Sequence, residues 1–348
     1  MLHEKWIVYD RPTPENRPLH PRRGPHDPVV GTPARRPGSI RRTTTTDLIR
    51  PQGANGDLVL QARGRDLLTT RDDRSVVVAE ASVTARIDFM NERVVREIST
   101  SPAIAGMETL IGVRTSIGFR RAVNRIAADE EERASLLYLL LDDVPVATLV
   151  SGYAVAYAGL RPMPDEHNHR LHPDLCAGWR TDGTILTEIR RSGFSSVVTG
   201  PPALPLRRPG DPVAWHEMPL LPPNAMRRHR RLDLTSSDPL DVDVLFRDSH
   251  MSFGGAETII HEYTVRATVE PTSLRIRDIE AVPHALPFVE CPAAADSAPR
   301  LAQSAVAGLR EKVMQEFLGP TTCTHLNDTL RSMEDVSGLV RILGHTTG

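Results

Sequence analysis

Apolar and polar residues alternate with a period of two along three neighbouring segments near the C-terminus. The segments are 242–248, 257–269 and 274–281, and the turn-forming strings Phe253-Gly254-Gly255 and Glu270-Pro271-Thr272-Ser273 separate them. Alternation with this period is typical of strands that bury one face. The pattern therefore predicts an antiparallel β-meander.

A helical pattern follows the predicted meander. Residues 298–318 carry apolar side chains at the spacing of one helical face, namely Leu301, Ala305, Leu309, Val313 and Phe317. Gly319-Pro320 ends this segment, and a second helix is expected after Thr322. Strands followed by helices, without strict alternation of the two, favour an α+β fold in which helices cover one face of a sheet.

The same order of elements occurs twice in the chain. The string Gly64-Arg65-Asp66-Leu67 matches Phe246-Arg247-Asp248-Ser249, and Gly118-Phe119-Arg120 matches Gly308-Leu309-Arg310. A duplicated unit within one chain suggests a fused pair. We predict two tandem repeats of a meander followed by helices, forming a pseudo-two-fold dimer of two sheets, over the ranges 41–158 and 227–348.

Two segments lie outside the predicted repeats. Residues 1–40 are rich in proline and arginine and show no apolar period, which predicts an extended, partly disordered arm. Residues 159–226 break into short pieces but contain Trp179 and Trp215. We expect this second segment to be a connector packed between the units.

Composition and charge narrow the classes of function. The 348 residues are 40% hydrophobic and carry a formal charge of -2, so the protein is expected to be globular, without nucleic-acid or membrane partners. The longest apolar stretch, 136–160, is interrupted by Pro145 and by Asp142 and Asp143, which we place at a solvated helix end. Three cysteines at irregular spacing and an N-terminus with no signal-peptide pattern predict a cytoplasmic location.

Comparison of the two predicted repeats indicates which one carries chemistry. His261 aligns with Ala79, and Cys323 and His325 align with Leu136 and Tyr138. Reactive side chains thus occur in the second repeat where the first has aliphatic or aromatic ones. We expect the second repeat to bear the site and the first to be a structural partner.

The settings of these residues leave their roles open. His261 is expected on the apolar face of its strand, either as a core histidine bonded to Asp248 or as a metal ligand or general base. Cys323 and His325 lie at a predicted helix start with Thr322 as the N-cap, where backbone N–H groups favour a thiolate. The alternative is that Cys323 is a small buried apolar residue.

Two thiols and two imidazoles are expected to converge at one end of the sheet, and such ligands suit zinc or iron. The predicted metal ligands are His261, Cys291, Cys323 and His325. Asp248 and Glu262 are the predicted supporting acids, with catalytic roles if the protein is an enzyme. A nucleophilic site at Cys323, and no chemistry at all, are the alternatives.

A dense basic run, 227–231, has two interpretations. It either forms a phosphate clamp for a ligand such as coenzyme A, or it is a charged strand start like Arg41-Arg42. Under the first interpretation, Arg247 joins Arg228 and Arg230 in binding an anionic substrate.

A further group of possible metal ligands occurs in the connector, where His-x-His spacing permits chelation but solvated side chains are the commoner outcome. This group comprises His167, His169, His172 and Cys176.

Three strings resemble a bacterial family known only as a domain of unknown function, number 2889 in that series. They are His261-Glu262-Tyr263, Leu286-Pro287-Phe288 running into Cys291-Pro292, and Cys323-Thr324-His325-Leu326. The family pattern resembles His-Asp in place of His261-Glu262, and a glycine where this chain has Thr322. The resemblance implies that the His, Cys, Cys, His set acts together, and it implies no activity.

A fainter likeness connects the chain with iron-sulfur cluster scaffold proteins. Those scaffolds also run a three-stranded meander into helices and place cysteines at the strand exit and at a helix start. The sequence as a whole favours a metal-binding protein. Its fullest form is a metal-dependent enzyme acting on an anionic or CoA-linked small molecule between the repeats of a pseudo-dimeric monomer or homodimer. A scaffold with a structural metal and a Cys-His acyl-transfer enzyme are the alternatives.

Overall fold

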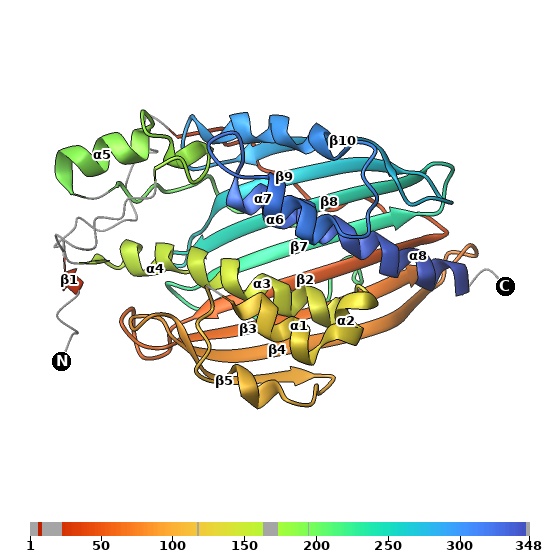
Figure 1. Cartoon of the computed structure of the whole chain (residues 1–348), viewed down its shortest axis with the longest axis horizontal. Coiled ribbons are helices and arrows are strands. Elements are labelled where there is room, and N and C mark those ends of the chain that lie inside the picture. The colour runs from red at the N-terminus through yellow and green to blue at the C-terminus, as the bar shows by residue number, and fades with distance from the viewer. Residues whose placement is uncertain (1–5, 9–22, 117, 163–172, 194, 346–348) are drawn as a thin grey trace.

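The structure is a computed structural model that describes residues 6–8, 23–116, 118–162, 173–193 and 195–345. Eight long strands form one antiparallel sheet in the order β10-β9-β8-β7-β2-β3-β4-β5 (Figure 1). The strands of this sheet are β2 (Ser39–Ile49), β3 (Leu58–Thr69), β4 (Ser75–Asp88), β5 (Val94–Ser101), β7 (Met226–Thr235), β8 (Leu240–Met251), β9 (Glu257–Val269) and β10 (Ile276–Ala285). Two short strands, β1 (Trp6–Val8) and β6 (Leu160–Pro162), pair separately.

Helices cover one face of the long sheet, in two groups. In Figure 1 the first group lies over β2–β4 and the second over β7–β9. The first group is α1 (Phe119–Ile126), α2 (Ala128–Glu132), α3 (Leu136–Val150) and α4 (Gly152–Tyr157). The second is α6 (Leu309–Glu316), α7 (Thr324–Ser332) and α8 (Val336–His345), and α5 (Thr184–Ser192) lies in the connector. The mixed α/β class with antiparallel strands is as predicted.

The two meanders join edge to edge and do not form separate sheets. β2 pairs with β7 along its length, with Thr44 opposite Arg230 and Thr46 opposite Arg228. The prediction of two sheets is therefore wrong, because β2, the first strand of one meander, pairs with β7, the first strand of the other meander. For brevity, β2–β5 with α1–α4 is called the N-terminal half, and β7–β10 with α6–α8 the C-terminal half.

Each half has its own apolar core between sheet and helices. The core of the N-terminal half contains Leu60, Val83 and Leu140, each 0% exposed. The core of the C-terminal half contains Val265 and Leu326, also 0% exposed. The alternation that predicted β8 and β9 is the pattern that buries one face of each strand against these helices.

The helix predicted over residues 298–318 is interrupted. A 3-10 helix covers Cys291–Leu301, and α6 begins only at Leu309. Between them Gln303 has a φ of 67°, and its N–H donates to the carbonyl of Ile276 on β10 (2.8 Å). The apolar residues have helical spacing, but the segment around Gln303 pairs with the edge strand β10 and so interrupts the helix.

Residues from the ranges 29–33 and 204–219 contact the face of the sheet opposite the helices. Trp215 is 1% exposed there, and its Nε1 donates to Thr32 (2.9 Å). Arg35 binds Asp211 with two nitrogens (2.9 and 3.1 Å). The prediction of a partly disordered arm is therefore wrong for residues 23–40, which pack with the connector, whereas residues 1–5 and 9–22 lie outside the described part.

One helical segment, Leu136–Tyr157, is long and apolar enough to cross a membrane by length and composition. Its apolar window is 78% buried inside the protein, as in a core helix of a soluble protein. Asp142 and Asp143 lie in this segment and are 4% and 2% exposed. The predicted solvated helix end is therefore wrong, because α3 continues through both aspartates and through Pro145.

Candidate metal centre

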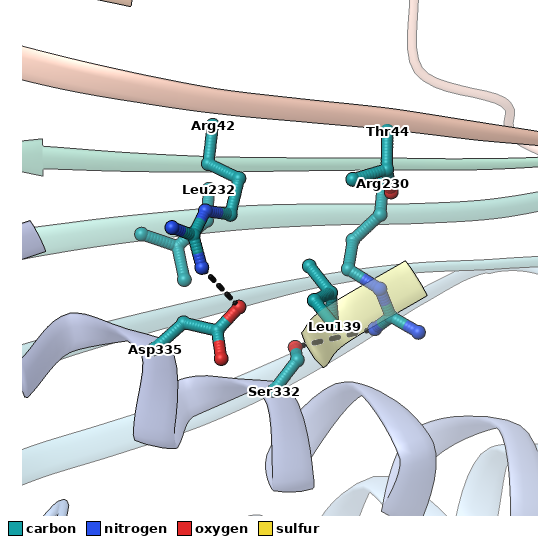
Figure 2. A pocket seen from close by; sticks show the side chains of 7 residues that line it. All are labelled: Arg42, Thr44, Leu139, Arg230, Leu232, Ser332 and Asp335. Atoms are coloured by element: carbon teal, nitrogen blue, oxygen red, sulfur yellow. Dashed lines mark hydrogen bonds and ion pairs between the residues drawn. The ribbon is translucent and has the colours of Figure 1, made fainter. Parts of the chain in front are cut away.

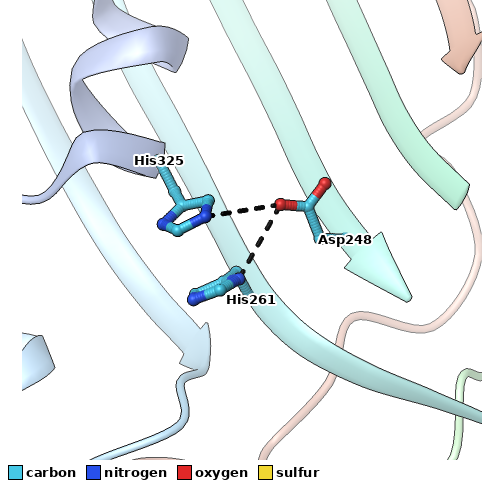
Figure 3. A group of neighbouring side chains, drawn as sticks. All are labelled: Asp248, His261 and His325. Carbon is cyan, nitrogen blue, oxygen red and sulfur yellow. Dashed lines mark ion pairs between the residues drawn. The ribbon is translucent and has the colours of Figure 1, made fainter. Parts of the chain in front are cut away.

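Asp248, His261 and His325 converge on the helix-covered face of the C-terminal half. One ligand atom from each lies within 4.8 Å of the other two. Asp248 Oδ2 is 3.7 Å from His261 Nδ1 and 3.8 Å from His325 Nε2. Figure 3 shows both imidazoles directed at this carboxylate. The two rings are stacked, with 3.5 Å between centroids and 18° between planes. These three residues are called the Asp-His-His cluster.

Strand pairing and one helix explain this convergence. Asp248 on β8 lies directly opposite His261 on β9, and the next pair is Ser249 with Ile259, so Ile260 is an extra residue in a bulge. Bulges re-aim neighbouring side chains. His325 reaches the pair from the first turn of α7.

Arg228 fixes the carboxylate of the cluster. Its Nε and Nη2 donate to the two oxygens of Asp248 (2.9 and 3.1 Å), and its Nη1 donates to Asp328 (2.8 Å). Asp328 follows His325 by three residues and so lies on the same face of α7. Both Arg228 and Asp248 are 1% exposed. A buried bidentate pair of this kind holds the acid in one orientation.

His261 is held in its neutral form. Burial, together with the nearby His325 and Arg228, lowers the pKa of His261 well below its ordinary value. Its Nδ1 makes no hydrogen bond to any described residue. A neutral imidazole with a free nitrogen is the form that ligates a metal.

Cys323 lies on the other side of the His325 ring. Its Sγ is 3.8 Å from His325 Nδ1, whereas Nε2 of the same ring faces Asp248. Burial is the largest single effect and opposes ionisation of this thiol, but the hydrogen bond and electrostatic interaction with His325, together with hydrogen bonds to Leu326 and Tyr263, outweigh burial and lower the pKa of Cys323. Cys323 is itself the N-cap residue of α7, because the helix begins at Thr324, and the Thr322 hydroxyl donates back to the Gly319 carbonyl (2.9 Å). The predicted N-cap at Thr322 is wrong.

The other two cysteines lie beside Cys323. Burial raises the pKa of Cys291 well above its usual value and that of Cys176 to about 11, and both thiols interact electrostatically with Cys323. The Ala177 N–H donates to the Thr322 carbonyl (2.8 Å), which joins the connector to the start of α7. Sequence reasoning missed the position of Cys176, since no local pattern relates these segments.

The set that the structure brings together differs from the predicted ligand set. His261 and His325 are shared by both. Asp248, predicted as a supporting acid, lies in the same cluster as the two histidines. Cys323 faces Nδ1 of His325, which is the ring nitrogen directed away from Asp248. Among the described residues, neither Cys323 nor Cys291 belongs to a group of three ligand atoms within 4.8 Å.

Arg247 and Glu262 lie on the opposite face of the sheet. Neighbours in a strand point to opposite faces, so Arg247 points away from Asp248. It binds Glu262, which is 0% exposed, and donates to the carbonyls of Leu204 and Val29 (2.6 and 2.7 Å). The prediction that these two residues serve the site is wrong, because this pair fastens the connector and the arm to the sheet.

The remaining predicted anion-binding arginines are also occupied. Arg230 is 1% exposed and donates to Asp143 (2.8 Å) and to Ser332 (3.2 Å). Figure 2 shows Arg230 reaching Ser332, and Arg42 reaching Asp335. The space that these residues line has no room for a water molecule. Arg228 is held by Asp248 and Asp328. Neither Arg228 nor Arg230 is therefore available to a ligand, and the structural interpretation of the basic run is the better one.

The connector histidines His167, His169 and His172 lie outside the described residues.

Comparison with known proteins gives one family match. Residues 226–338 match the sequence profile of a family described as "Protein of unknown function (DUF2889)". This confirms the predicted resemblance over that segment, which contains the whole Asp-His-His cluster. No curated protein and no solved structure matched the chain, so the likeness to iron-sulfur scaffolds stays a prediction.

Proposed function

We propose that this protein binds one transition-metal ion through Asp248, His261 and His325. The observation that carries the proposal is the approach of three ligand atoms, from two strands and one helix, to within 4.8 Å of one another. Ligand atoms of a tetrahedral or octahedral ion at about 2.1 Å lie roughly 3–3.5 Å apart. Small side-chain shifts close the remaining gap.

The donor set supports zinc or iron. Two histidines and one carboxylate form catalytic zinc sites, and the same set forms the facial triad of non-haem iron enzymes. Both kinds of site keep coordination positions for water or substrate. Arg228 would hold Asp248 from behind, as an outer partner that orients a ligating carboxylate.

Elemental analysis of the purified protein tests this proposal. We expect about one zinc or iron atom per chain, and an absorption spectrum distinguishes coloured iron from zinc. His261→Ala should lose the metal. His284→Ala is the matched control, because His284 lies on β10 and binds Thr264 (2.9 Å). A His261→Ala protein that keeps its full metal content contradicts the assignment.

A second candidate function rests on Cys323. A thiol, a base and an orienting acid follow one another here. Cys323 Sγ is 3.8 Å from His325 Nδ1, and His325 Nε2 is 3.8 Å from Asp248 Oδ2. This arrangement is that of a nucleophile activated by a histidine. In a metal-bound protein, His325 Nε2 would be a ligand and Cys323 would not, so metal should change how His325 acts on Cys323. A rate of Cys323 alkylation that is unchanged by metal addition therefore favours the nucleophile.

Whether the metal serves catalysis or only stabilises the fold is a separate question. A purely structural ion predicts that chelation unfolds the protein, and an ion in an open site predicts that chelation leaves the circular dichroism spectrum intact. We favour the open site, because each half of the protein already has its own apolar core. An anionic or CoA-linked substrate, a cytoplasmic location and a homodimer remain proposals.

We propose that the two halves arose by duplication. Arg42 binds Asp66 with two nitrogens as Arg228 binds Asp248, and Asp66 lies opposite Ala79 as Asp248 lies opposite His261. A register shift follows the aspartate in each case. An experimental structure in which β2–β5 superposes on β7–β10 with these pairs coincident supports the proposal, and mismatched pairs refute it.

A further inference from the structure

A cavity of about 630 Å³ lies between the helices of the two halves, away from the Asp-His-His cluster. Its wall includes the starts of α1 and α6, together with parts of α3 and α7. Four arginines line it: Arg120, Arg121, Arg310 and Arg331. A cavity of this size is within the range that binds small molecules.

The two helix starts at this cavity have the same geometry but different partners. Gly118 and Gly308 precede α1 and α6 with φ of 83° and 81°. At α6 the Arg310 N–H donates to the carboxylate of Glu334 (2.8 Å). α1 has no side-chain cap and no acidic residue in its first turn. The protein thus supplies an anion at one start and none at the other.

The inner wall holds arginines whose hydrogen-bonding capacity is not filled. Arg310 has a side chain only 6% exposed, yet its Nε and Nη1 have no hydrogen-bond partner among the described residues. Their nearest carboxylate oxygens, on Asp142 and Glu334, are 3.5 and 3.7 Å away. The Nε of Arg331 also lacks a partner. The Nη2 of Arg310 pairs with Asp335, so three carboxylates balance the charge of Arg310, and only its Nε and Nη1 keep hydrogen-bonding capacity for a further partner.

The acidic residues of the wall do not neutralise the outer arginine. Glu131 accepts hydrogen bonds from Asn124 and Tyr138 (2.7 and 3.0 Å), and Glu311 accepts one from Gln315. Arg121 is exposed at the cavity and forms no ion pair with any described residue. Its guanidinium therefore lies at the cavity without a paired carboxylate among the described residues.

We propose that this cavity binds a small anionic molecule through a carboxylate or phosphate group, held by Arg121 and the start of α1 and enclosed by Arg310 and Arg331. Bidentate guanidinium contacts and an uncapped helix start both suit such a group. This inference does not depend on the metal, because none of these residues belongs to the Asp-His-His cluster. It replaces the buried basic run as the place where an anion is recognised.

Isothermal titration calorimetry at low ionic strength tests the proposal with two probes, inorganic phosphate and citrate. We expect saturable binding of at least one probe at one site per chain, and the preferred probe distinguishes a phosphate from a carboxylate ligand. Arg121→Ala should weaken binding about tenfold, and Arg121→Glu should abolish it. The absence of saturable binding to the folded wild type overturns the proposal.

Arg125→Ala is the matched control. Arg125 is exposed on the same helix but does not line the cavity. We expect this variant to bind within about twofold of the wild type, since an exposed charge that does not line the cavity contributes little. Equal weakening by Arg121→Ala and Arg125→Ala would show only general attraction and would overturn the assignment.

A second variant separates this inference from the proposed function. His261→Ala should lose the metal and keep anion binding. If the folded His261→Ala protein loses anion binding, the anion is bound at the metal centre and not in this cavity. If it keeps both the metal and the anion, the metal assignment fails while the cavity assignment stands.

Discussion

The two halves of the sheet carry the same buried arginine-aspartate pair in different surroundings. In the N-terminal half Arg42 holds Asp66, and in the C-terminal half Arg228 holds Asp248, with all four residues at most 2% exposed. Each arginine also reaches a helix, through Asp335 or Asp328. The pair itself therefore joins the sheet to the helix layer in both halves.

The difference lies in what surrounds the aspartate. Ala79 lies opposite Asp66, whereas His261 lies opposite Asp248. At the helix start, Leu136 packs so closely over Gly64 that a β-carbon there would lie 2.8 Å from it, whereas His325 lies over Phe246 at 6.2 Å between ring centroids. Two imidazoles thus convert a structural pair into a candidate metal centre, while the other half keeps an apolar environment.

The largest predicted effect is loss of either aspartate. Asp248→Ala should lower the free energy of unfolding by about 3 kcal/mol, because it leaves Arg228 buried with only part of its counter-charge. Asp66→Ala should cost about the same through Arg42. Urea denaturation measures both. Metal content separates them: Asp248→Ala should lose the metal, and Asp66→Ala should keep it.

A smaller effect concerns two adjacent aspartates where the halves meet. Burial raises the pKa of Asp143 to about 6, although Arg230 opposes the shift. By contrast, Arg120, Arg331 and Arg310 overcome burial and keep the pKa of Asp142 below its ordinary value. Of these two aspartates, Asp143 is therefore the one expected to bind a proton in the folded state under mildly acidic conditions.

The sign of the resulting pH dependence follows from linkage. Between about pH 4 and 6 the folded state binds more protons at Asp143 than the unfolded state does, so its contribution to stability falls as the pH rises. Relative to Asp143→Asn, the wild type should lose about 2 kcal/mol across this window. A stability difference between the two proteins that stays constant from pH 4 to 7 would contradict the raised pKa.

Exchanging the residue opposite the aspartate in each half should have a smaller effect on stability than removing the aspartate. His261→Ala should cost about 1 kcal/mol in metal-free protein, since its Nδ1 makes no hydrogen bond to described residues. Ala79→His should gain no metal, because the N-terminal half has Leu136 and Tyr138 at the start of α3 and no second imidazole. Binding of a second metal ion by Ala79→His would show that one imidazole beside the pair is enough.

The smallest effect concerns the rates at which two equally buried thiols react. Cys323 and Cys291 are 6% and 7% exposed, but the pKa is lowered at Cys323 and raised at Cys291. Iodoacetamide should therefore modify Cys323 first, as read by mass spectrometry of peptides. His325→Ala should remove this preference. Equal rates in the wild type would mean that His325 does not activate the thiol.

Much of the fold was predictable because strand burial leaves a local signature. The alternation in β8 and β9 and the matching Arg-Asp strings indicated the meanders. The pairing of β2 with β7 was not predictable, because it joins residues far apart in sequence, with no pattern that marks an edge as open. The prediction of one helix over 298–318 was wrong for a related reason. Gln303 pairs with Ile276, and this tertiary contact overrides the helical spacing.

Of the predicted ligands, the two histidines fall in the Asp-His-His cluster, and the two cysteines do not. His261 and His325 stand out because they are polar residues at apolar or helix-start positions. His325 directs Nδ1 at Cys323 and Nε2 at Asp248. This orientation depends on side-chain geometry, which the spacing of residues in the sequence does not reveal. The buried aspartates of α3 were missed, because their arginine partners come from other elements. A useful signal was available at Asp328, which follows His325 by three residues on one helical face.

The most direct test of the metal centre is anomalous diffraction from crystals grown with zinc. We expect one strong peak bonded to Asp248 Oδ2, His261 Nδ1 and His325 Nε2, with Arg228 still holding the aspartate. A peak coordinated by Cys323 and Cys291, or a fully ordered protein with no peak near His261, would contradict it.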